Sequence, residues 1–167
     1  KIGEGLEWMP QAGEKVNTVK FPYLKSGEVV NVKYRDSSKN FKMIKDAERT
    51  LYGYDDIVGD TLIWVEGEID KLSVEVAGMM SCVSVPNGAS DKLDFLESIE
   101  DRLEPIKNHI LALDNDTPGK KLEGELIRRL DPEKCKLVNW PDGCKDANDT
   151  LLNHGKEKTR ECIDRAK

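Results

Sequence analysis

Four short apolar runs recur along the second two-thirds of the chain, at residues 61–66, 82–85, 109–113 and 135–140. Each is short and bounded by turn residues or polar segments, a pattern typical of a buried strand. Helix-patterned segments separate the runs, and strands that alternate with helices form βαβ units around a parallel sheet. We therefore predict an α/β fold, with a Rossmann-type core of about four parallel strands flanked by helices.

The first helical segment, residues 68–77, has apolar side chains at helical spacing. Ile69, Leu72, Val76 and Met80 fall near one face when they are plotted on a helix.

Residues that favour helix starts open the remaining helical segments. Ser90 is a candidate N-cap after the second strand, and Thr117 is one after the third, with Pro118 at the first helical position. Asp146 or Asn148 starts the last helix. These caps place each helix start just beyond a strand end.

The first sixty residues have a different pattern. Residues 19–24 and 29–35 flank a Lys-Ser-Gly turn and predict a hairpin, to which residues 41–44 add a third strand. Residues 1–15 contain few periodic apolar positions, and we expect them to be loosely ordered. We predict a small β-rich N-terminal subdomain at residues 1–58, the α/β domain at 59–155, and a charged C-terminal helix or linker at 156–167.

Acidic residues follow two of the predicted strands. Glu66, Glu68 and Asp70 come at the end of the first strand, and Asp114 and Asp116 follow the third. Ligands of open α/β sheets bind outside the carboxyl ends of the strands, so these acids are expected at one edge. Five carboxylates there would repel one another unless a cation lay among them, and Mg²⁺ takes oxygen ligands of this kind. The pattern therefore indicates phosphate chemistry on a metal ion.

Each of these acids also has a plainer interpretation. Glu68 and Asp70 lie in the first turn of a helix, where negative charge is favourable, and Asp116 could assist in capping the next helix. Asp146 follows the fourth strand and reaches the same edge, although alone it is an ordinary N-cap. Glu66 is harder to explain in this way, because a carboxylate at the end of an apolar strand needs a partner. Free of metal, it could serve as a general base.

Basic and aromatic residues of the N-terminal region give a weaker signal. Lys33, Arg35, Lys39 and Lys42 could contact a triphosphate or a template, or they could be solvated surface residues. The aromatic residues form no obvious platform for stacking bases. They are Trp8, Tyr34, Phe41, Trp64 and Trp140.

Composition limits the remaining possibilities. The net charge of −6 argues against nucleic-acid binding by bulk electrostatics, so such contacts would be local or metal-bridged. The four cysteines form no C-x-x-C pair, so we expect free thiols in a reducing compartment and no structural zinc site. No apolar stretch approaches the roughly 18 residues of a membrane span, so no membrane partner is expected. The chain shows no targeting segment and starts without Met, so we expect it to be a piece of a longer protein.

Together these motifs resemble a known family. The run V-E-G-E-I-D at residues 65–70, followed by Asp114-x-Asp116 with Pro118-Gly119 behind it, is similar to the Toprim domain of primases, topoisomerases and some nucleases. The loop N-G-A-S at residues 87–90 and the run C-K-D-A-N-D at residues 144–149 resemble the branch of T-odd phage primase-helicases and Twinkle-type organellar proteins. Residues 32–53 are also similar to the N-terminal subdomain of that primase core.

The resemblance implies a primase catalytic core that makes RNA primers from ribonucleoside triphosphates on a single-stranded DNA template, using Mg²⁺ or Mn²⁺. It implies Glu66 as the acid near the reacting hydroxyl, and Lys33, Arg35 and Lys39 near nucleotide or template. Metal ligands or their supports would be Glu66, Glu68, Asp70, Asp114, Asp116 and Asp146.

The resemblance also bears on partners and location. The zinc-binding module and helicase of full enzymes lie outside this chain, which lacks both motifs. The retained acids favour the priming-competent plant and algal kind, and hence mitochondria or plastids. Two alternatives remain: a non-catalytic module that binds nucleic acid or couples to a helicase, and a Toprim nuclease.

Overall fold

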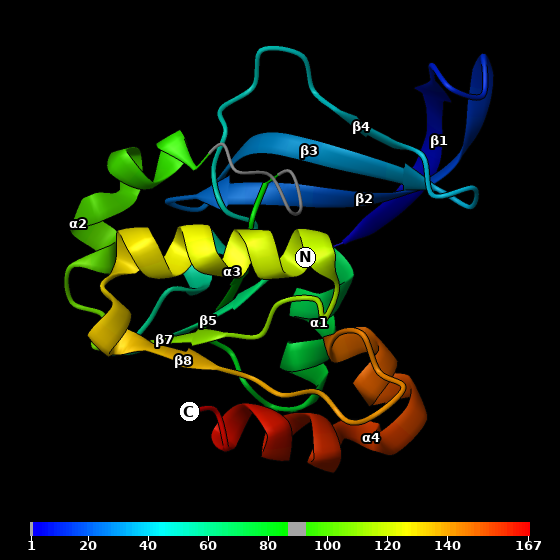
Figure 1. Cartoon of the computed structure of the whole chain (residues 1–167). Coiled ribbons are helices and arrows are strands. Elements are labelled where there is room, and N and C mark those ends of the chain that lie inside the picture. The colour runs from blue at the N-terminus through cyan, green and yellow to red at the C-terminus, as the bar shows by residue number, and fades with distance from the viewer. Residues whose placement is uncertain (1, 87–92) are drawn as a thin grey trace. The chain divides into compact units, whose positions relative to one another are not determined.

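The computed structural model describes residues 2–86 and 93–167, and the chain divides into two compact units, Lys1–Asp55 and Asp56–Lys167. The first unit contains a four-stranded antiparallel sheet in the order β1-β2-β3-β4. Its strands, labelled in Figure 1, are β1 (Gly3–Met9), β2 (Glu14–Lys25), β3 (Glu28–Asp36) and β4 (Phe41–Met43). The predicted hairpin and third strand are confirmed.

The expectation that residues 1–15 are loosely ordered is wrong. Strand β1 pairs with β2 in an antiparallel register that runs from Gly3 opposite Lys20 to Met9 opposite Glu14. The apolar pattern failed because Leu6 and Trp8 point to solvent and only Met9 of this strand is buried. Backbone hydrogen bonds to β2 order the strand in place of a buried face.

Aromatic side chains form much of the core of the first unit. Phe21 and Tyr23 of β2 are fully buried and pack against Tyr52, with ring centroids 5.9 and 5.3 Å apart. Leu51, which precedes Tyr52 in the sequence, is also buried. Edge-to-face and tilted aromatic contacts of this kind add to the free energy gained from burying the rings.

The second unit is built on a four-stranded parallel sheet in the order β6-β5-β7-β8. The strands are β5 (Thr61–Val65), β6 (Cys82–Ser84), β7 (Asn108–Leu111) and β8 (Cys135–Leu137). The α-helices are α1 (Glu68–Val76), α2 (Glu100–Leu103), α3 (Thr117–Leu130) and α4 (Ala147–Asp164), and the 3₁₀ turns are η2 (Asp94–Ile99) and η3 (Pro132–Lys134). A further 3₁₀ turn, η1 (Tyr54–Asp56), spans the point in the sequence where the two units meet. The predicted α/β class is confirmed.

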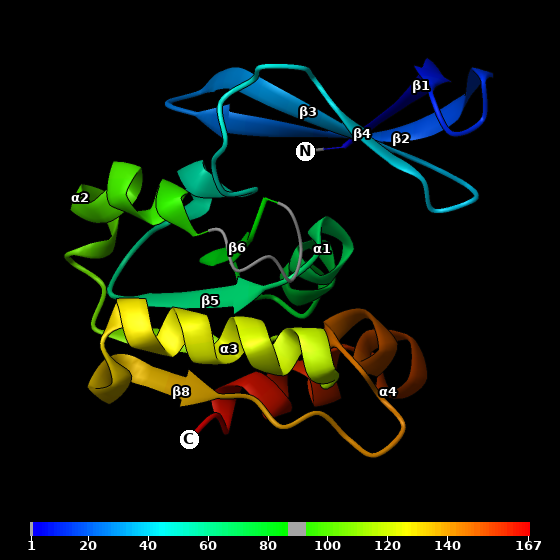
Figure 2. The ribbon, with the colours of Figure 1, turned by 45° about the horizontal axis from the view of Figure 1, so that its top comes forward.

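Helices cover both faces of the parallel sheet. Figures 1 and 2 show α3 on one side of the sheet and α4 on the other. On the α4 side, Ile63 and Val65 of β5 pack with Val74 of α1 and with Cys162 and Ile163 of α4. Because both faces are covered, the strands are apolar without strict alternation, which is why they appear as continuous apolar runs in the sequence.

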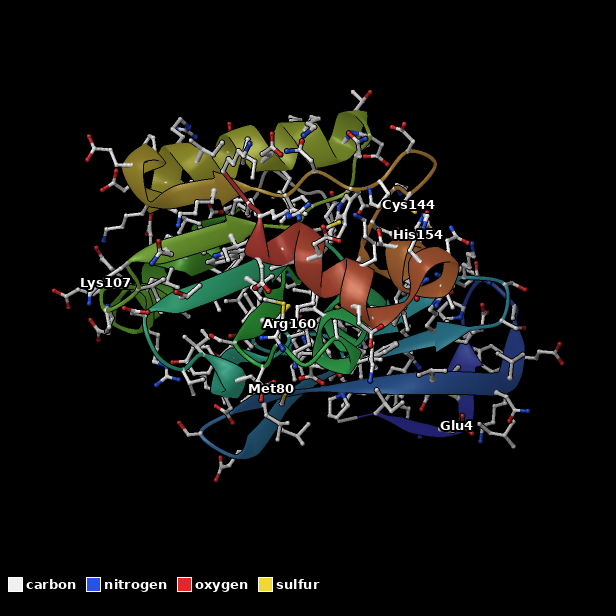
Figure 3. All side chains as sticks on the ribbon, turned by 90° about the horizontal axis from the view of Figure 1, so that it is seen from below. Glu4, Met80, Lys107, Cys144, His154 and Arg160 are labelled. Atoms are coloured by element: carbon white, nitrogen blue, oxygen red, sulfur yellow. The ribbon has the colours of Figure 1, made fainter. Side chains whose placement is uncertain are left out.

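The apolar spacing of α1 in the sequence does not mark the face that the helix buries. Val76 and Met80 are 60% and 55% exposed (Met80 is labelled in Figure 3), whereas Val74 and Lys71 are buried. The Lys71 ammonium lies 2.5 Å from Asp56 Oδ2 and also pairs with Glu75. A lysine can take a core position when its charge is paired, so apolar spacing alone does not identify the buried face.

Other element boundaries differ from the sequence prediction in detail. Ser90 and the loop 87–90 lie outside the described residues, and the described part of that segment forms η2 and α2 in place of one regular helix. Strand β8 ends at Leu137, before the predicted end at Trp140. The carboxyl ends of β5, β7 and β8 nevertheless precede the acidic segments in the chain, as predicted.

The last helix belongs to the second unit. Helix α4 is interrupted at Gly155, which adopts φ 81°, and its second half buries Thr159, Cys162 and Ile163. Backbone hydrogen bonds of 2.7 and 3.2 Å join Leu137 to Lys167.

The domain boundaries proposed from the sequence, at residues 1–58, 59–155 and 156–167, remain predictions. Within the described residues, no helix has the length and apolar character to cross a membrane.

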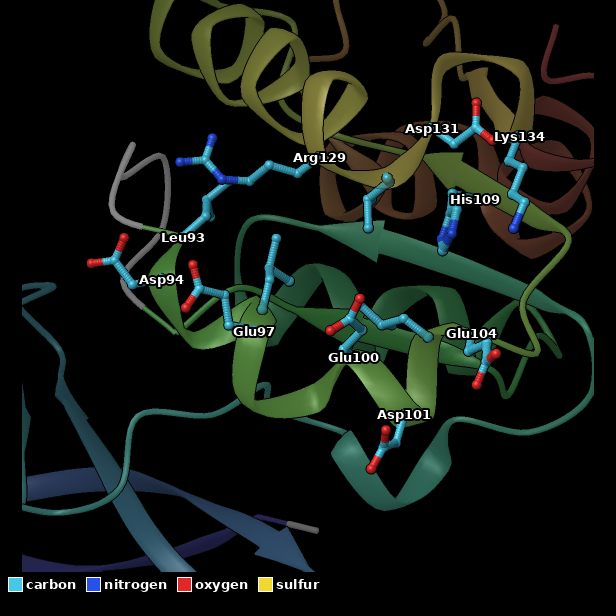
Figure 4. A pocket seen from close by; sticks show the side chains of 13 residues that line it. Leu93, Asp94, Glu97, Glu100, Asp101, Glu104, His109, Arg129, Asp131 and Lys134 are labelled. Carbon is cyan, nitrogen blue, oxygen red and sulfur yellow. The ribbon is translucent and has the colours of Figure 1, made fainter.

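His109 of β7 is a buried histidine held in its neutral form. The Trp64 indole N–H donates to His109 Nδ1 over 3.1 Å, and burial, with Lys134 nearby, lowers the pKa of His109 to about 4. Figure 4 shows His109 with Asp131 and Lys134 in a pocket of about 610 Å³, whose other residues come from η2, α2 and the end of α3.

We predict an acid-dependent loss of stability that depends on His109. Between pH 6.5 and pH 4 the unfolded chain binds a proton at this residue and the folded chain does not, so stability falls as the pH falls, by about 3 kcal/mol in total. The His109→Gln variant lacks this titration. Urea unfolding of both proteins across this range should show a shallower pH dependence in the variant, and parallel profiles would contradict the assignment.

Candidate metal centre

The carboxyl ends of three parallel strands bring the acidic segments together. Glu66 follows β5, Asp114 follows β7, and Lys145 and Asp146 follow β8. The backbone N–H of Asn115 donates to the Lys145 carbonyl over 2.7 Å, which joins the β7 and β8 segments directly. The predicted meeting of these segments at one edge of the sheet is present.

Three carboxylates form the first group of possible metal ligands. Oxygen atoms of Glu66, Asp114 and Asp116 all lie within 4.8 Å of one another. Glu66 is buried at 8% exposure, and its Oε1 accepts from the Asp114 backbone N–H over 3.3 Å. The Glu66 carboxylate is thus held in place at the end of a buried strand.

A second group shares one member with the first. Oxygen atoms of Asp70, Asp114 and Asp146 also lie within 4.8 Å of one another. Asp70 is positioned by the backbone N–H of Asn148, which donates to its Oδ1 over 3.1 Å. Because Asp114 belongs to both groups, the five carboxylates form one continuous centre.

Lys145 places a positive charge inside this centre. Its ammonium lies 2.8 Å from Asp114 Oδ2 and 3.0 Å from Asp116 Oδ2, and these bonds raise its pKa. Sequence reasoning did not assign it a role, although it directly precedes Asp146. The ion pairs place Oδ2 of Asp114 and Oδ2 of Asp116 on one side of the chain.

The acids respond differently to their surroundings. Burial and the charge of Asp114 raise the pKa of Glu66 to about 7. Burial and the neighbouring Asp146 raise the pKa of Asp70 well above its usual range, and burial raises the pKa of Asp114 despite Lys145. The pKa of Asp116 is lowered, because its carboxylate accepts the Gly119 N–H. One ammonium therefore does not neutralise the centre.

This donor set fits a hard divalent cation. Carboxylate oxygens are the ligands that Mg²⁺ and Mn²⁺ take in proteins, and a cation would relieve the repulsion that raises these pKa values. The residues that would hold it are Glu66, Asp114 and Asp116, with Asp70 and Asp146 beside the shared Asp114.

Asp116 has a second role at the start of α3. Its Oδ1 accepts from the Gly119 N–H over 2.9 Å, so Asp116 is the N-cap of this helix and Thr117 is its first residue. The prediction that Thr117 caps the helix is wrong, and the alternative that Asp116 does so is correct. Its other oxygen, Oδ2, still faces Lys145.

Two glycines allow backbone and carboxylates to approach closely. A Cβ atom at Gly119 would lie 2.1 Å from the Asp114 carbonyl oxygen and 2.6 Å from Glu66 Oε1. A Cβ at Gly67 would lie 2.9 Å from Asp70 Oδ2. Sequence analysis noted Pro118-Gly119 only as part of a family pattern, because this steric requirement depends on segments distant in the sequence.

Glu68 is not part of either group of carboxylates. It is buried at 3% exposure in the first turn of α1. Lys33 and Arg35 lie on β3 of the first unit, and Lys39 follows that strand with φ 62°. The metal role of Glu68 and the nucleotide role of these three basic residues remain predictions.

Comparison with known proteins agrees with this geometry. Residues 63–151, about half of the chain, match the Toprim-like family model. This segment spans the strand ends that carry Glu66, Asp114 and Asp146. The chain belongs to the Toprim-like family, and the resemblance predicted from the acidic motifs is confirmed.

Within this family the chain resembles primase-helicases. It is 38% identical over 165 residues to the chloroplastic/mitochondrial Twinkle homolog of Arabidopsis thaliana. The matched segment covers 87% of this chain and 23% of the relative. The primase fragment of the bacteriophage T7 primase-helicase overlays with a TM-score of 0.77 at 29% identity, over 89% of this chain and 63% of that one.

A further solved structure gives a wider overlay. It contains bacteriophage T7 lagging-strand DNA polymerase with primase domains bound to an RNA/DNA hybrid and dTTP. A chain in it overlays with a TM-score of 0.82 at 28% identity, over 98% of this chain and 83% of that one. The chain thus has a primase-core fold, and it spans about a quarter of the Arabidopsis relative's length.

We predict that Gly119→Ala disrupts the centre, whereas Gly124→Ala does not. Both glycines lie in α3, but a Cβ at Gly124 meets no atom within 4 Å. Gly124→Ala should stabilise the protein by about 0.5–1 kcal/mol through helix propensity. Gly119→Ala forces the Asp114 backbone to move, and we expect a loss of about 2 kcal/mol or more.

Chemical denaturation of the two variants and the wild-type protein measures this contrast. Mn²⁺ binding should weaken only in Gly119→Ala, because that substitution displaces Asp114 and Glu66. Equal stability of both variants, with unchanged metal affinity, would show that the close approach at Gly119 is not required.

Proposed function

We propose that this chain is a primase catalytic core that joins ribonucleotides on a single-stranded DNA template in the presence of Mg²⁺ or Mn²⁺. The observation that carries the proposal is the acidic centre at the carboxyl edge of a Toprim-like sheet, where Glu66, Asp114 and Asp116 converge. Similarity to a T7 primase fragment supports this reaction over other phosphate chemistry.

The five carboxylates of the two groups, Asp114 included, would hold the cation, and we assign Glu68 in the first turn of α1 as a support. When bound, a divalent ion of this kind stabilises negative charge on the phosphates and lowers the pKa of a coordinated hydroxyl. Lys145 already contacts Asp114 and Asp116, so it keeps these two side chains in place before nucleotides bind.

Glu66 is the proposed proton acceptor. Each addition forms a bond between the 3′-oxygen of one nucleotide and the α-phosphorus of the next, and it breaks the bond from that phosphorus to the bridging oxygen of pyrophosphate. The 3′-hydroxyl proton passes to Glu66. A carboxylate placed directly after β5, beside Asp114 and Asp116, is suited to act as a general base there.

Basic residues of the first unit are the proposed contacts for substrates. We assign Lys33, Arg35 and Lys39 to the incoming nucleotide or the template, in line with the family resemblance. Their guanidinium and ammonium groups suit phosphate oxygens. The solved structure with primase domains bound to an RNA/DNA hybrid supports nucleic acid as the partner class.

The parent protein and its location are also proposals. We infer that a zinc-binding module and a helicase, on the same chain or a partner, supply template choice and unwinding. We further propose a mitochondrial or plastid location with a role in organellar DNA replication. The similarity to the chloroplastic/mitochondrial Twinkle homolog supports this location.

A primer-synthesis assay tests the proposed function. The chain is incubated with single-stranded DNA, labelled ribonucleotides and Mg²⁺ or Mn²⁺, beside the variants Asp114→Asn and Asp101→Asn. Asp114 belongs to both carboxylate groups, whereas Asp101 is an acid of α2 outside them. We expect short RNA products from the wild-type protein and Asp101→Asn, and a loss of at least about 100-fold in Asp114→Asn.

Each other outcome identifies an alternative. Shortened DNA without RNA would indicate a nuclease that uses the same centre. Equal RNA synthesis by Asp114→Asn would contradict the assigned site. If no product forms even when a zinc-binding module is supplied, the chain is a binding or helicase-coupling module and the proposal fails.

A further inference from the structure

The pocket of about 610 Å³ in Figure 4 lies at the amino-terminal edge of the parallel sheet. His109 is the second residue of β7, and Lys134 comes directly before β8. The candidate metal centre follows the opposite ends of these strands and shares no residue with the pocket. We call this cavity the amino-edge pocket; its lining includes Leu93, Leu96, Leu130 and His109, with acids of η2 and α2 along one side.

The interior of the pocket is largely apolar. Leu93, Leu96 and Leu130 come from two segments distant in the sequence, and all three are buried while still lining the cavity. Cavities of this volume, with apolar walls and a few placed polar groups, are typical of binding sites. The pocket is therefore able to take an apolar side chain of a ligand.

His109 supplies one polar group inside the pocket. The Trp64 indole N–H can only donate, so His109 Nδ1 accepts its hydrogen bond and the proton of the neutral ring lies on Nε2. The ring is 2% exposed, and Nε2 has no hydrogen-bond partner within residues 2–86 and 93–167. A buried N–H without a partner costs free energy, and a carbonyl oxygen in the pocket would satisfy it.

Four acids form one wall of the pocket. They recur every three or four residues along η2, α2 and the residue after α2, and Figure 4 shows them in a row: Asp94, Glu97, Glu100 and Glu104. All four are exposed, and none has an ion-pair partner in the part of the chain that the structure describes. This wall attracts positive charge.

The opposite wall does not cancel this charge. Its basic residues are Arg129, which already pairs with Glu125, and Lys134, and Asp131 lies between them in the sequence. The excess of acids repels a nucleic acid or another polyanion. The ligand that complements the pocket is therefore cationic as well as apolar.

The length of the acidic wall favours a chain over a small molecule. The four acids span eleven residues, a helical path of at most roughly 20 Å. An extended peptide covers that distance with roughly six residues. A peptide also carries the carbonyl groups that His109 Nε2 lacks as partners, so a basic and apolar segment matches every feature of the site.

We propose that the amino-edge pocket docks a basic, apolar peptide segment of a partner protein. An apolar side chain of that segment enters the cavity between Leu96 and Leu130. Its Lys or Arg side chains lie along the four acids, and a peptide carbonyl accepts from His109 Nε2. This docking needs neither metal nor nucleotide, so it stands apart from the proposed primase function.

Nuclear magnetic resonance of the full chain tests the docking directly. The probe is a short capped peptide of Leu and Lys in a helical pattern, and the chain carries nitrogen-15 in its histidine rings. The chain has two histidines, and His154 is exposed on α4 outside the pocket, so it is an internal control. We expect the Nε2 signal of His109 to move on titration while the signals of His154 stay in place.

Peptide affinity, followed by fluorescence anisotropy, separates docking from general attraction between charges. Glu97→Lys and Glu100→Lys should each weaken binding by about tenfold, because each replaces an attraction by a repulsion. Glu157→Lys makes the same charge change at an exposed site on α4 and should leave the affinity unchanged. A peptide with Ala in place of Leu should bind at least about tenfold more weakly, since it lacks the apolar anchor.

Three results would overturn the proposal. The first is a His109 signal that does not move when the peptide binds, or no binding at all. The second is equal weakening by Glu100→Lys and Glu157→Lys, which would indicate attraction to the acidic surface as a whole. The third is self-association of the chain that Glu100→Lys abolishes, which would make the occupant a second copy instead of a partner. Primer synthesis has no bearing on any of these outcomes.

Discussion

Repulsion between carboxylates at one edge of the parallel sheet is the main constraint on the structure of the second unit. Two full negative charges 4.8 Å apart repel by about 3 kcal/mol at an effective dielectric constant near 20. Five such groups, Asp114 among them, meet at this edge. The protein offsets this with the Lys145 ammonium, with backbone N–H donors to Glu66, Asp70 and Asp116, and with a raised pKa at Glu66. These interactions reduce the repulsion between the carboxylates without removing it. The repulsion that remains favours the binding of a divalent cation.

The constraint explains several local features that otherwise have no common cause. Strands β5, β7 and β8 are parallel, so their ends deliver acids to the same place. Gly119 lets the start of α3 lie against the Asp114 carbonyl and Glu66. Asp116 divides its two oxygens between the helix start and Lys145. A change in any of these elements alters the spacing of the carboxylates, and therefore the affinity for a cation.

The sequence predicted the acids well because their positions depend on local order. Glu66 and Asp114 directly follow apolar strands, and parallel strands end at one edge, so their meeting needed no knowledge of packing. Lys145 and Gly119 were missed because their roles depend on contacts between segments far apart in the chain. The apolar spacing of α1 does not identify its buried face, since a paired lysine, Lys71, takes a core position. Strand β1 was missed because its order comes from backbone pairing, which leaves no apolar periodicity.

Divalent-cation binding is the most direct test of this account. Electron paramagnetic resonance of Mn²⁺ titrated into the wild-type chain should show saturable binding at a site that Mg²⁺ competes for. Asp114→Asn should remove this binding, because Asp114 is shared by both groups of carboxylates, and Asp101→Asn should retain it. Retained Mn²⁺ binding in Asp114→Asn, or none in the wild-type chain, would contradict the claim that these carboxylates form a metal centre.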